Sequence, residues 1–370
     1  MLAIDMLPGG HGDALIIEYG HGLDVRRVLV DGGTVHSWEE AVRPALLKRL
    51  PQRRLEAFVV THVDEDHIGG CLKLLKDPDL RHLIGDVWFN GYIHCNAGST
   101  DDALGPVDGE RLTSAIREGQ FTWNRVFPNP LRDSMGGPVV VPTKGELPSI
   151  ALSGGAVVRL LSPAPAKLET MARKWASVVE EAGIVKGEGT DIDGRPPPVY
   201  PTTAQGLPSP LTREWLESCS AKTPPDRAPA NGSSIAFLFE FDGHRALLGA
   251  DAHPGILCDS LRRFAKSLGV ERVPVDLVKL PHHGSKGNVT SDLIGLLDCG
   301  TYLISTNGDV FGHPDAEAIA RIICASSQPP TFYCNYRTPA TSDWERRAPD
   351  IGAQFVLPRD VLTPGLRVEV

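Results

Sequence analysis

The most informative stretch of the chain reads Thr61-His62-Val63-Asp64-Glu65-Asp66-His67-Ile68-Gly69-Gly70. It follows an apolar run, residues 55–60, which we expect to form a buried strand. The stretch holds four common metal ligands, His62, Asp64, Asp66 and His67. Imidazole and carboxylate groups at the end of a core strand are costly to desolvate unless they are paired or bind metal. The sequence therefore indicates a metal site, and we expect the two glycines to allow a tight turn into a helix.

The spacing of the four ligands predicts more than one metal position. His62 and Asp64 are two residues apart and lie on one side of an extended backbone, whereas His67 turns to the other side. Such a loop can present two pairs of ligands to adjacent ions, which lie about 3.5–4 Å apart in two-metal hydrolytic centres. The alternative is a solvated acidic loop in which Asp66 caps the helix and His67 has no role. Four ligands together favour metal.

The stretch resembles the first signature of the metallo-β-lactamase fold, which is His-x-His-x-Asp-His followed by Gly-Gly. Asp64 stands where the second histidine usually lies, and this variant resembles the metallo-β-lactamase domain of ComEC-type DNA-uptake proteins and their soluble relatives. Further segments resemble that subfamily in the same order, namely residues 4–14, 28–33, 231–241, 247–251, 278–285 and 311–314. The resemblance covers roughly residues 1–90, 140–165 and 230–370, and several motifs in register are more specific than one.

The resemblance implies that Asp251 bridges the two metals. Residues 236–248 alternate in character around Asp242-Gly243, which predicts a hairpin that delivers Asp251 at a strand end. An aspartate there can reach two ions through its two oxygens. The alternative is that Asp251 caps the helix that follows, because aspartate is a good N-cap.

Two adjacent histidines follow another apolar strand, residues 275–280. We expect His282 to bind the second metal. His283 should point the other way, where it lies behind the ligands, protonates a leaving group or is a simple loop histidine. Lys279, His283 or His313 could stabilise charge on the departing oxygen, and Asp66 could accept a proton from the attacking water.

The resemblance also places His313 at the rim of the active site. It precedes Pro314 and the helical-looking run 316–323, and we expect the proline in the first turn of that helix. Its role, metal binding or substrate contact, is left open.

One expected ligand is missing. The ordinary fold supplies a further histidine to the first metal, whereas this chain has Asn231-Gly232-Ser233-Ser234 at the corresponding place. Together with Asp64, this makes the first site poorer in nitrogen and richer in oxygen, which shifts the preference from zinc towards manganese, magnesium or iron. We expect two divalent ions, Mn²⁺ or Zn²⁺ with Mn²⁺ preferred; a single-metal centre is the alternative.

The expected fold class is α/β, a four-layer αβ/βα sandwich in which two mixed sheets face each other beneath outer helices. The chain of 370 residues, 41% of them apolar, is long enough for a single domain spanning residues 1–370. We expect insertions at about 91–138 and 165–230, with helices near 108–118 and 165–183. The halves 1–165 and 230–370 should each contribute one sheet. Residues 186–230 are rich in Pro, Gly and Ser, which suggests a long lid-like loop.

Composition limits location and partners. The chain lacks the run of about 18 apolar residues that spans a bilayer, so we expect no membrane contact. Its N-terminus lacks a secretory pattern, and its seven cysteines form no CxxC pair, which favours reduced thiols in the cytoplasm. The net charge of −9 and the dispersed basic residues argue against a nuclease that tracks long duplex DNA. Oligomeric state is not predicted.

The function that the resemblance implies is phosphodiester hydrolysis by a metal-activated water, on a nucleic-acid or nucleotide-like substrate. Fold alone does not define a substrate. One alternative is hydrolysis of a lactone, a thioester or a β-lactam. Another is an interaction module with weak or no catalysis.

Overall fold

The computed structural model describes residues 1–50, 54–95, 107–129, 136–182 and 206–370, and for residues 176–182 it describes the backbone only. Its strands form two large mixed sheets and one small pair, β11 (Val273–Pro274) with β13 (Leu297–Asp298). The order in the first sheet is β17 (Leu366–Glu369), β1 (Leu2–Met6), β2 (Leu15–His21), β3 (Asp24–Val30), β4 (Ala57–Val59), β5 (Asp86–Trp88) and β6 (Thr122–Trp123). The order in the second sheet is β16 (Gln354–Val356), β15 (Thr331–Cys334), β14 (Thr301–Ile304), β12 (Leu277–Lys279), β10 (His244–Leu248), β9 (Ala236–Phe241), β8 (Val157–Ser162) and β7 (Ser149–Ala151).

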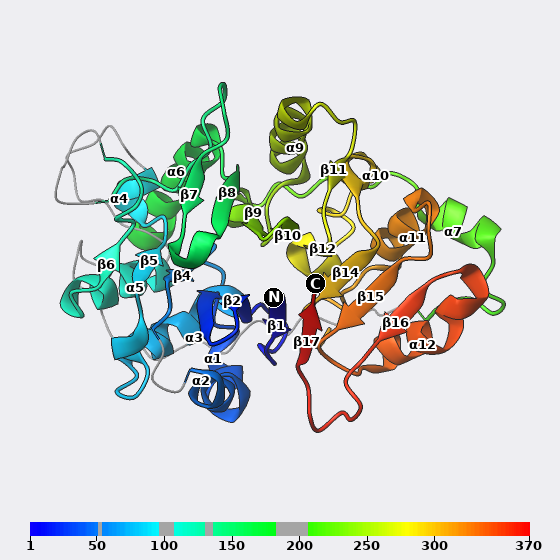
Figure 1. Ribbon diagram of the computed structural model, residues 1–370, viewed down its shortest axis with the longest axis horizontal. Coiled ribbons are helices and arrows are strands. Elements are labelled where there is room, and N and C mark those ends of the chain that lie inside the picture. The colour runs from blue at the N-terminus through cyan, green and yellow to red at the C-terminus, as the bar shows by residue number, and fades with distance from the viewer. Residues whose placement is uncertain (51–53, 96–106, 130–135, 183–205) are drawn as a thin grey trace.

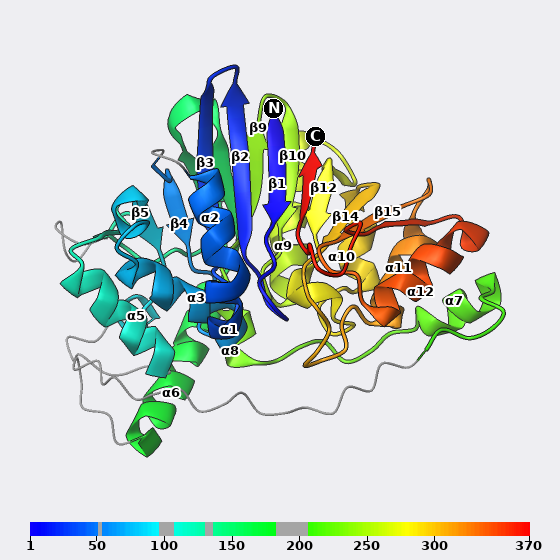
Figure 2. The same ribbon diagram turned by 90° about the horizontal axis from the view of Figure 1, so that it is seen from below.

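The helices lie outside the paired sheets, so that the molecule has four layers (Figures 1 and 2). Those of the N-terminal part are α1 (Val35–Ser37), α2 (Arg43–Arg49), α3 (Glu65–Lys76), α4 (Tyr92–Cys95), α5 (Val107–Glu118) and α6 (Pro165–Ala182). Those of the C-terminal part are α7 (Arg213–Cys219), α8 (Pro229–Gly232), α9 (Pro254–Leu268), α10 (Ser291–Gly295), α11 (Ala316–Ala325) and α12 (Pro339–Arg347). This arrangement confirms the αβ/βα sandwich.

Strand β2 shows why the sheets are covered on both faces. Leu15, Ile17 and Tyr19 face the core between the two sheets. Ile16 faces the other way, into a second core beneath α2 and α3. Successive side chains of a strand point to opposite faces, so a run of consecutive apolar residues must be buried on both. The ring of Tyr19 lies 5.1 Å from that of Phe239 in the opposite sheet, which joins the two inner faces.

The expectation of one sheet from each half of the chain is wrong at two places. Strands β7 and β8 lie in the N-terminal half, yet β8 pairs with β9 and extends the second sheet. Strand β17, at the C-terminal end, pairs antiparallel with β1 in the first sheet. Hydrophobic alternation identifies a strand but does not identify its neighbour, because pairing is decided by contacts distant in sequence.

Several local predictions are confirmed. Helices α5 and α6 occupy the two regions where helices were expected. Strands β9 and β10 form the hairpin, with Asp242 and Gly243 at positive φ, as a tight two-residue turn requires. Residues 186–205 of the expected lid-like loop lie outside the described residues, and residues 206–230 contain α7 and the start of α8. The single-domain boundary stays a prediction.

Two further findings concern the whole described chain. None of its helices is both long and apolar enough to cross a membrane. All seven cysteines carry free thiols.

Candidate metal centre

The candidate ligands follow three strands that end at the same side of the sandwich. The segment from His62 to His67 follows β4, Asp251 follows β10, and His282 and His283 follow β12. Strands β10 and β12 are parallel neighbours, so their carboxyl ends lie together. Such ends, with loops on a rigid scaffold, are where α/β proteins usually place functional groups.

Asp251 lies between two groups of ligands, and each of its oxygens faces one of them. Its Oδ1 atom is 3.4 Å from Nε2 of His67 and 3.9 Å from Nε2 of His283. The Oδ2 atom of Asp66 is 3.4 Å from the same His283 nitrogen and 3.8 Å from that of His67. We call Asp66, His67 and His283 the second ligand group.

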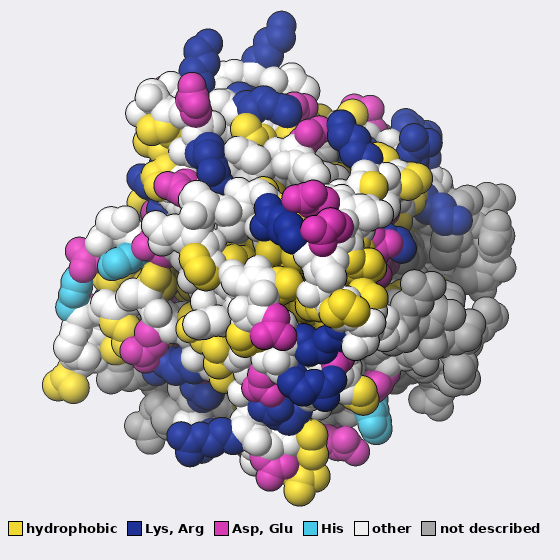
Figure 3. Space-filling model, turned by 90° about the vertical axis from the view of Figure 1, so that its right-hand side faces the viewer, with side chains coloured by type: hydrophobic (Ala, Val, Ile, Leu, Met, Phe, Trp, Pro, Cys, Tyr) yellow, Lys and Arg dark blue, Asp and Glu magenta, His cyan; other side chains and the backbone are white. Residues whose placement is uncertain are grey.

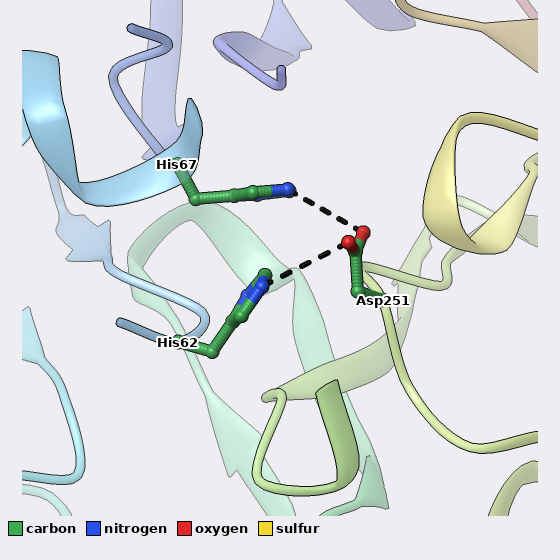
Figure 4. A group of neighbouring side chains, drawn as sticks. All are labelled: His62, His67 and Asp251. Atoms are coloured by element: carbon green, nitrogen blue, oxygen red, sulfur yellow. Dashed lines mark ion pairs between the residues drawn. The ribbon is translucent and has the colours of Figure 1, made fainter. Parts of the chain in front are cut away.

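The other oxygen of Asp251 faces the first ligand group, His62, Asp64 and His282. Its Oδ2 atom is 3.8 Å from Nε2 of His62 and 3.6 Å from Nε2 of His282. The Oδ2 atom of Asp64 is 3.5 Å from the same His62 nitrogen. Figure 4 shows Asp251 between His62 and His67, with one carboxylate oxygen directed towards each ring. Asp251 does not cap a helix, since His253 is the N-cap of α9.

The unpaired atoms of this cluster fit divalent metal. Nε2 of His62, His67 and His283 is buried without a hydrogen-bond partner among the described residues, as is Oδ1 of Asp251. Buried polar atoms are rarely left unpaired in folded proteins, and four within one cluster require an explanation. Two of the possible metal-binding triads in the described chain are His62, His67 and Asp251, and Asp66, His67 and His283.

The two adjacent histidines differ from the sequence-based expectation. His282 was expected at the second metal, and His283 was expected to point the other way, behind the ligands, towards a leaving group or as a simple loop histidine. Instead, Nε2 of His283 faces the second ligand group and His282 faces the first. The backbone explains this result, because both residues are left-handed, with φ of 49° and 54°. Alternation of side chains holds for an extended strand and fails in such a turn. Both imidazoles therefore point towards Asp251.

Two further side chains and one backbone carbonyl group hold the histidines of the second ligand group. Asp31 accepts hydrogen bonds from the backbone N–H of Thr61 (2.8 Å) and from its hydroxyl (2.7 Å). The same carboxylate lies 2.8 Å from Nδ1 of His67. For His283, Nδ1 lies 2.8 Å from the carbonyl oxygen of Ser305 and 3.4 Å from Oδ1 of Asp13. Partners on Nδ1 leave Nε2 free to bind metal, as in many metal sites.

A different set of residues holds His282. Its Nδ1 atom lies 3.0 Å from Oδ1 of Asn288 and 3.4 Å from Nδ2 of Asn231. Asp226 accepts hydrogen bonds from both asparagines, at 3.0 and 2.7 Å. Asn231, which stands near the expected place of the missing histidine, thus supports His282. Because His282 brings a second nitrogen to the first ligand group, the argument for an oxygen-rich site no longer favours Mn²⁺ over Zn²⁺.

The charged groups of the cluster strongly shift one another's pKa values. Burial opposes ionisation of Asp251, but the imidazoles of His282, His67 and His283 outweigh it and hold its pKa well below the usual value. Burial likewise disfavours protonation of His67, yet the carboxylates of Asp251 and Asp66 raise its pKa well above the usual value. A dense set of opposite charges in a low-dielectric site suits a divalent cation, which displaces the protons from the imidazoles.

Lys279 does not suit the role expected for it. Its side chain is 1% exposed and its ammonium group donates a hydrogen bond to Oδ2 of Asp13. An ammonium group that is buried and paired in this way is unavailable to a leaving group. Lys279 thus supports the site from beneath through Asp13, which also faces His283.

His313 lies at the rim, as expected. Its ring is 5.4 Å from that of His282, and its Nδ1 atom is 3.6 Å from Oδ2 of Asp315. Burial lowers the pKa of His313, although Asp315 acts in the opposite direction. Pro314 lies before the N-cap Asp315 rather than in the first turn of α11, because the helix begins at Ala316.

The two glycines after His67 lie inside helix α3 and do not form a turn. A Cβ atom on Gly70 would lie 2.0 Å from the carbonyl oxygen of Gly32, and one on Gly69 would lie 2.7 Å from the backbone nitrogen of Val35. The glycines therefore allow α3 to approach the loop after β3, which carries Asp31.

Sequence reasoning missed the residues that hold the ligands. Asp13 and Asp31 stand within segments that were recognised. Asp13 lies shortly before β2 and Asp31 directly after β3, but nothing in the sequence shows which histidine each of them contacts. Asp226 and Asn288 carried no signal. His11 was missed as well; burial lowers its pKa, and the charges of Asp66 and His283 act on it from nearby.

The histidines and aspartates described above follow strands of both sheets of the sandwich. Residues 8–123 match the family model of the Metallo-beta-lactamase superfamily. A segment of 95 residues is 32% identical to ComE operon protein 3 of Bacillus subtilis (strain 168); it spans 22% of this chain and 12% of that protein.

Solved structures similar to the chain share little sequence with it. The CmlA beta-hydroxylase E377D mutant is 15% identical, with 99% of this chain and 54% of that chain covered and a TM-score of 0.40. Zn(2+)-bound PqqB from Methylobacterium extorquens is 11% identical. The match covers 100% of this chain and 100% of that chain, with a TM-score of 0.37. The metallo-beta-lactamase SMB-1, bound to 2-mercaptoethanesulfonate, is 12% identical. The match covers 85% of this chain and 88% of that chain, with a TM-score of 0.30.

Proposed function

We propose that the protein hydrolyses phosphodiester bonds with the help of two divalent ions, and that its substrates are nucleic acids or nucleotide-like molecules. The observation that carries the proposal is the position of Asp251, whose two oxygens face two separate ligand groups. Paired metal sites of this kind are common in phosphatases and nucleases, where they bind the attacking and the leaving oxygen. The ComEC-like form of the ligand motif supports a phosphodiester over other substrates.

The residues present would hold the ions as follows. His62, Asp64 and His282 would bind one, Asp66, His67 and His283 the other, and Asp251 would bind both. Such ions lower the pKa of a bound water and polarise the phosphoryl oxygen. Asp66 would also accept the proton of the attacking water; the position of its Oδ2 atom beside His67 and His283, within the cluster, supports this role. His313 would donate a hydrogen bond to the departing oxygen, and the nearness of its ring to His282 supports this role.

Surface charge favours a short substrate. The chain carries 37 basic and 46 acidic residues. On the face shown in Figure 3, Lys and Arg side chains are interspersed with Asp and Glu, and the described residues of that face form no continuous basic stripe. Proteins that follow long duplex DNA neutralise many phosphates with such a stripe. We therefore favour a nucleotide-like diester or a short strand.

The proposal is tested by hydrolysis of bis-p-nitrophenyl phosphate and of labelled single- and double-stranded DNA with Mn²⁺, Zn²⁺ or Mg²⁺. Wild-type protein is compared with the double variant Asp66→Ala/His67→Ala and with Asp251→Asn. Asp259→Asn is the matched control, since Asp259 is exposed on α9 and pairs only with Arg262 among the described residues. We expect metal-dependent cleavage that both site variants lose and the control keeps.

Two other results would contradict the proposal. Metal-loaded protein that cleaves no phosphodiester would point to another ester, such as a lactone, a thioester or a β-lactam. Protein that neither binds metal nor cleaves would favour an interaction module. Metal content measured on the same samples separates these two cases.

A further inference from the structure

An exposed aromatic ring lies beside the first ligand group. Phe311, between β14 and α11, is 48% exposed, and it is the one exposed residue among the Phe, Tyr and Trp side chains that the structure describes. Its ring centroid is 6.3 Å from that of His282 and 5.8 Å from that of His313. The Phe311 and His313 rings are stacked, with an interplanar angle of 27°. Contact of this ring with a bound substrate would remove apolar surface from water.

The loop that carries Phe311 is tied to the site on both sides. Before the ring, the backbone N–H of Asn307 donates to the carbonyl oxygen of Gly10 at 2.9 Å. After it, the backbone N–H of Asp315 donates to the carbonyl oxygen of Gly284 at 3.0 Å. Gly284 adjoins His283, so the loop is anchored next to a candidate ligand. The ring is therefore held in place before a substrate arrives, which reduces the entropic cost of binding.

We propose that Phe311 selects substrates in which one ester group of the phosphodiester carries a flat ring, namely a nucleobase, and that it stacks on that ring. This inference rests on the proposed function. A diester held by metal ions at Asp251 and the first ligand group would have a substituent on the side of His282, where the Phe311 ring is exposed. Stacking on an aromatic side chain accepts any base, because every base has a π-face. In duplex DNA the base faces are already stacked, so the contact favours nucleotides and single strands over duplexes.

The test compares substrates that share a leaving group. Bis-p-nitrophenyl phosphate and methyl p-nitrophenyl phosphate both release p-nitrophenol, but only the first keeps a ring on the other ester. For Phe311→Ala we expect kcat/KM on the aryl diester to fall about tenfold through KM. On the methyl diester we expect a loss of less than about twofold, since the ring contact is absent there.

Other variants separate stacking from simple apolar contact and from instability. Phe311→Trp should keep the preference for the aryl diester, whereas Phe311→Leu, which is apolar but not flat, should lose it. Leu362→Ala is the surface control, because Leu362 is 84% exposed in the loop before β17. Equal losses on both diesters, or full activity of Phe311→Ala on the aryl diester, would overturn the proposal.

A binding measurement keeps this inference separate from the proposed function. Phenylphosphonate and methylphosphonate are titrated into Zn²⁺-loaded protein by calorimetry, which requires no turnover. Tighter binding of phenylphosphonate, lost in Phe311→Ala, supports the ring contact even if no diester is cleaved. Equal affinities, or no binding of either phosphonate, would overturn it.

Discussion

The ammonium group of Lys279 donates a hydrogen bond to the carboxylate of Asp13, and this pair joins a central strand of the second sheet to the loop between β1 and β2 of the first. Both side chains are almost fully buried. The carboxylate that receives this bond also lies 3.4 Å from Nδ1 of His283. A contact between the two sheets is thus also a support for a candidate metal ligand, so stability and metal binding are coupled at this point.

Removal of the lysine should show that coupling. Lys279→Met leaves the Asp13 carboxylate buried without its charge partner, which typically costs about 3–5 kcal/mol of unfolding free energy. Urea denaturation measures the loss. Arg213→Met is the control, because the Arg213–Glu217 pair is exposed on α7 and such pairs contribute less than about 1 kcal/mol. The double variant Asp13→Leu/Lys279→Met should recover part of the stability, and a Lys279→Met protein as stable as the control would contradict the prediction.

Asp31 should matter for metal affinity more than for stability. The change Asp31→Asn keeps an acceptor for Thr61 and suits the left-handed backbone of this residue (φ 58°), but it removes the charge that faces Nδ1 of His67. Loss of such a partner behind a metal-binding histidine typically lowers metal affinity about 10–100-fold. Competition with a chelating dye measures this change. The control Asp24→Asn, which changes an exposed surface pair with Arg26, should bind metal like the wild type. If Asp31→Asn also binds metal as tightly as the wild type, Asp31 does not support His67.

The stability of protein stripped of metal by a chelator should fall as the pH rises. Burial lowers the pKa of His282, but the carboxylate of Asp251 and the contacts with Asp226 and Asn288 raise it to about 9. The unfolded value is about 6.5, so between these values the folded state binds more protons than the unfolded one. The contribution is fully present below pH 6.5 and is lost as pH rises to about 9.

Denaturation midpoints at several pH values test this sign. The midpoint of His282→Gln should fall less steeply over the same pH window. The midpoint of His36→Gln, a change at an exposed position, should follow that of the wild type. Metal binding must displace the His282 proton, so metal affinity should rise with pH and calorimetry in two buffers should detect proton release. Stability that rises with pH in the wild type would contradict the assignment.

The ligand loop, the hairpin before Asp251 and the layered fold could be predicted because each has a local signal. His62 to His67 follow an apolar strand, and Asp242-Gly243 is a recognisable turn. The side of the site that each of the adjacent histidines faces could not be predicted, because it depends on two left-handed residues in succession. The contacts of Asp13 with Lys279 and of Asp31 with His67 join segments distant in sequence. Local patterns contain no information on such contacts, and the same reason explains the misplaced strands β8 and β17.

Gly70 offers a test of the close approach between α3 and the loop after β3. An alanine inside a helix normally adds up to about 1 kcal/mol of stability over glycine. At Gly70, however, the new methyl group would lie 2.0 Å from the carbonyl oxygen of Gly32, a backbone atom that cannot move away by rotation of a side chain. We expect Gly70→Ala to destabilise the fold by about 1–3 kcal/mol, as overpacking does elsewhere. Gly255→Ala in α9 is the matched control, because a Cβ there would meet no atom within 4 Å, and it should be neutral or stabilising. Gly32 follows Asp31, so a shift of this loop should also weaken metal binding through His67. A Gly70→Ala protein that gains stability like the control would contradict the prediction and show that the loop can move aside.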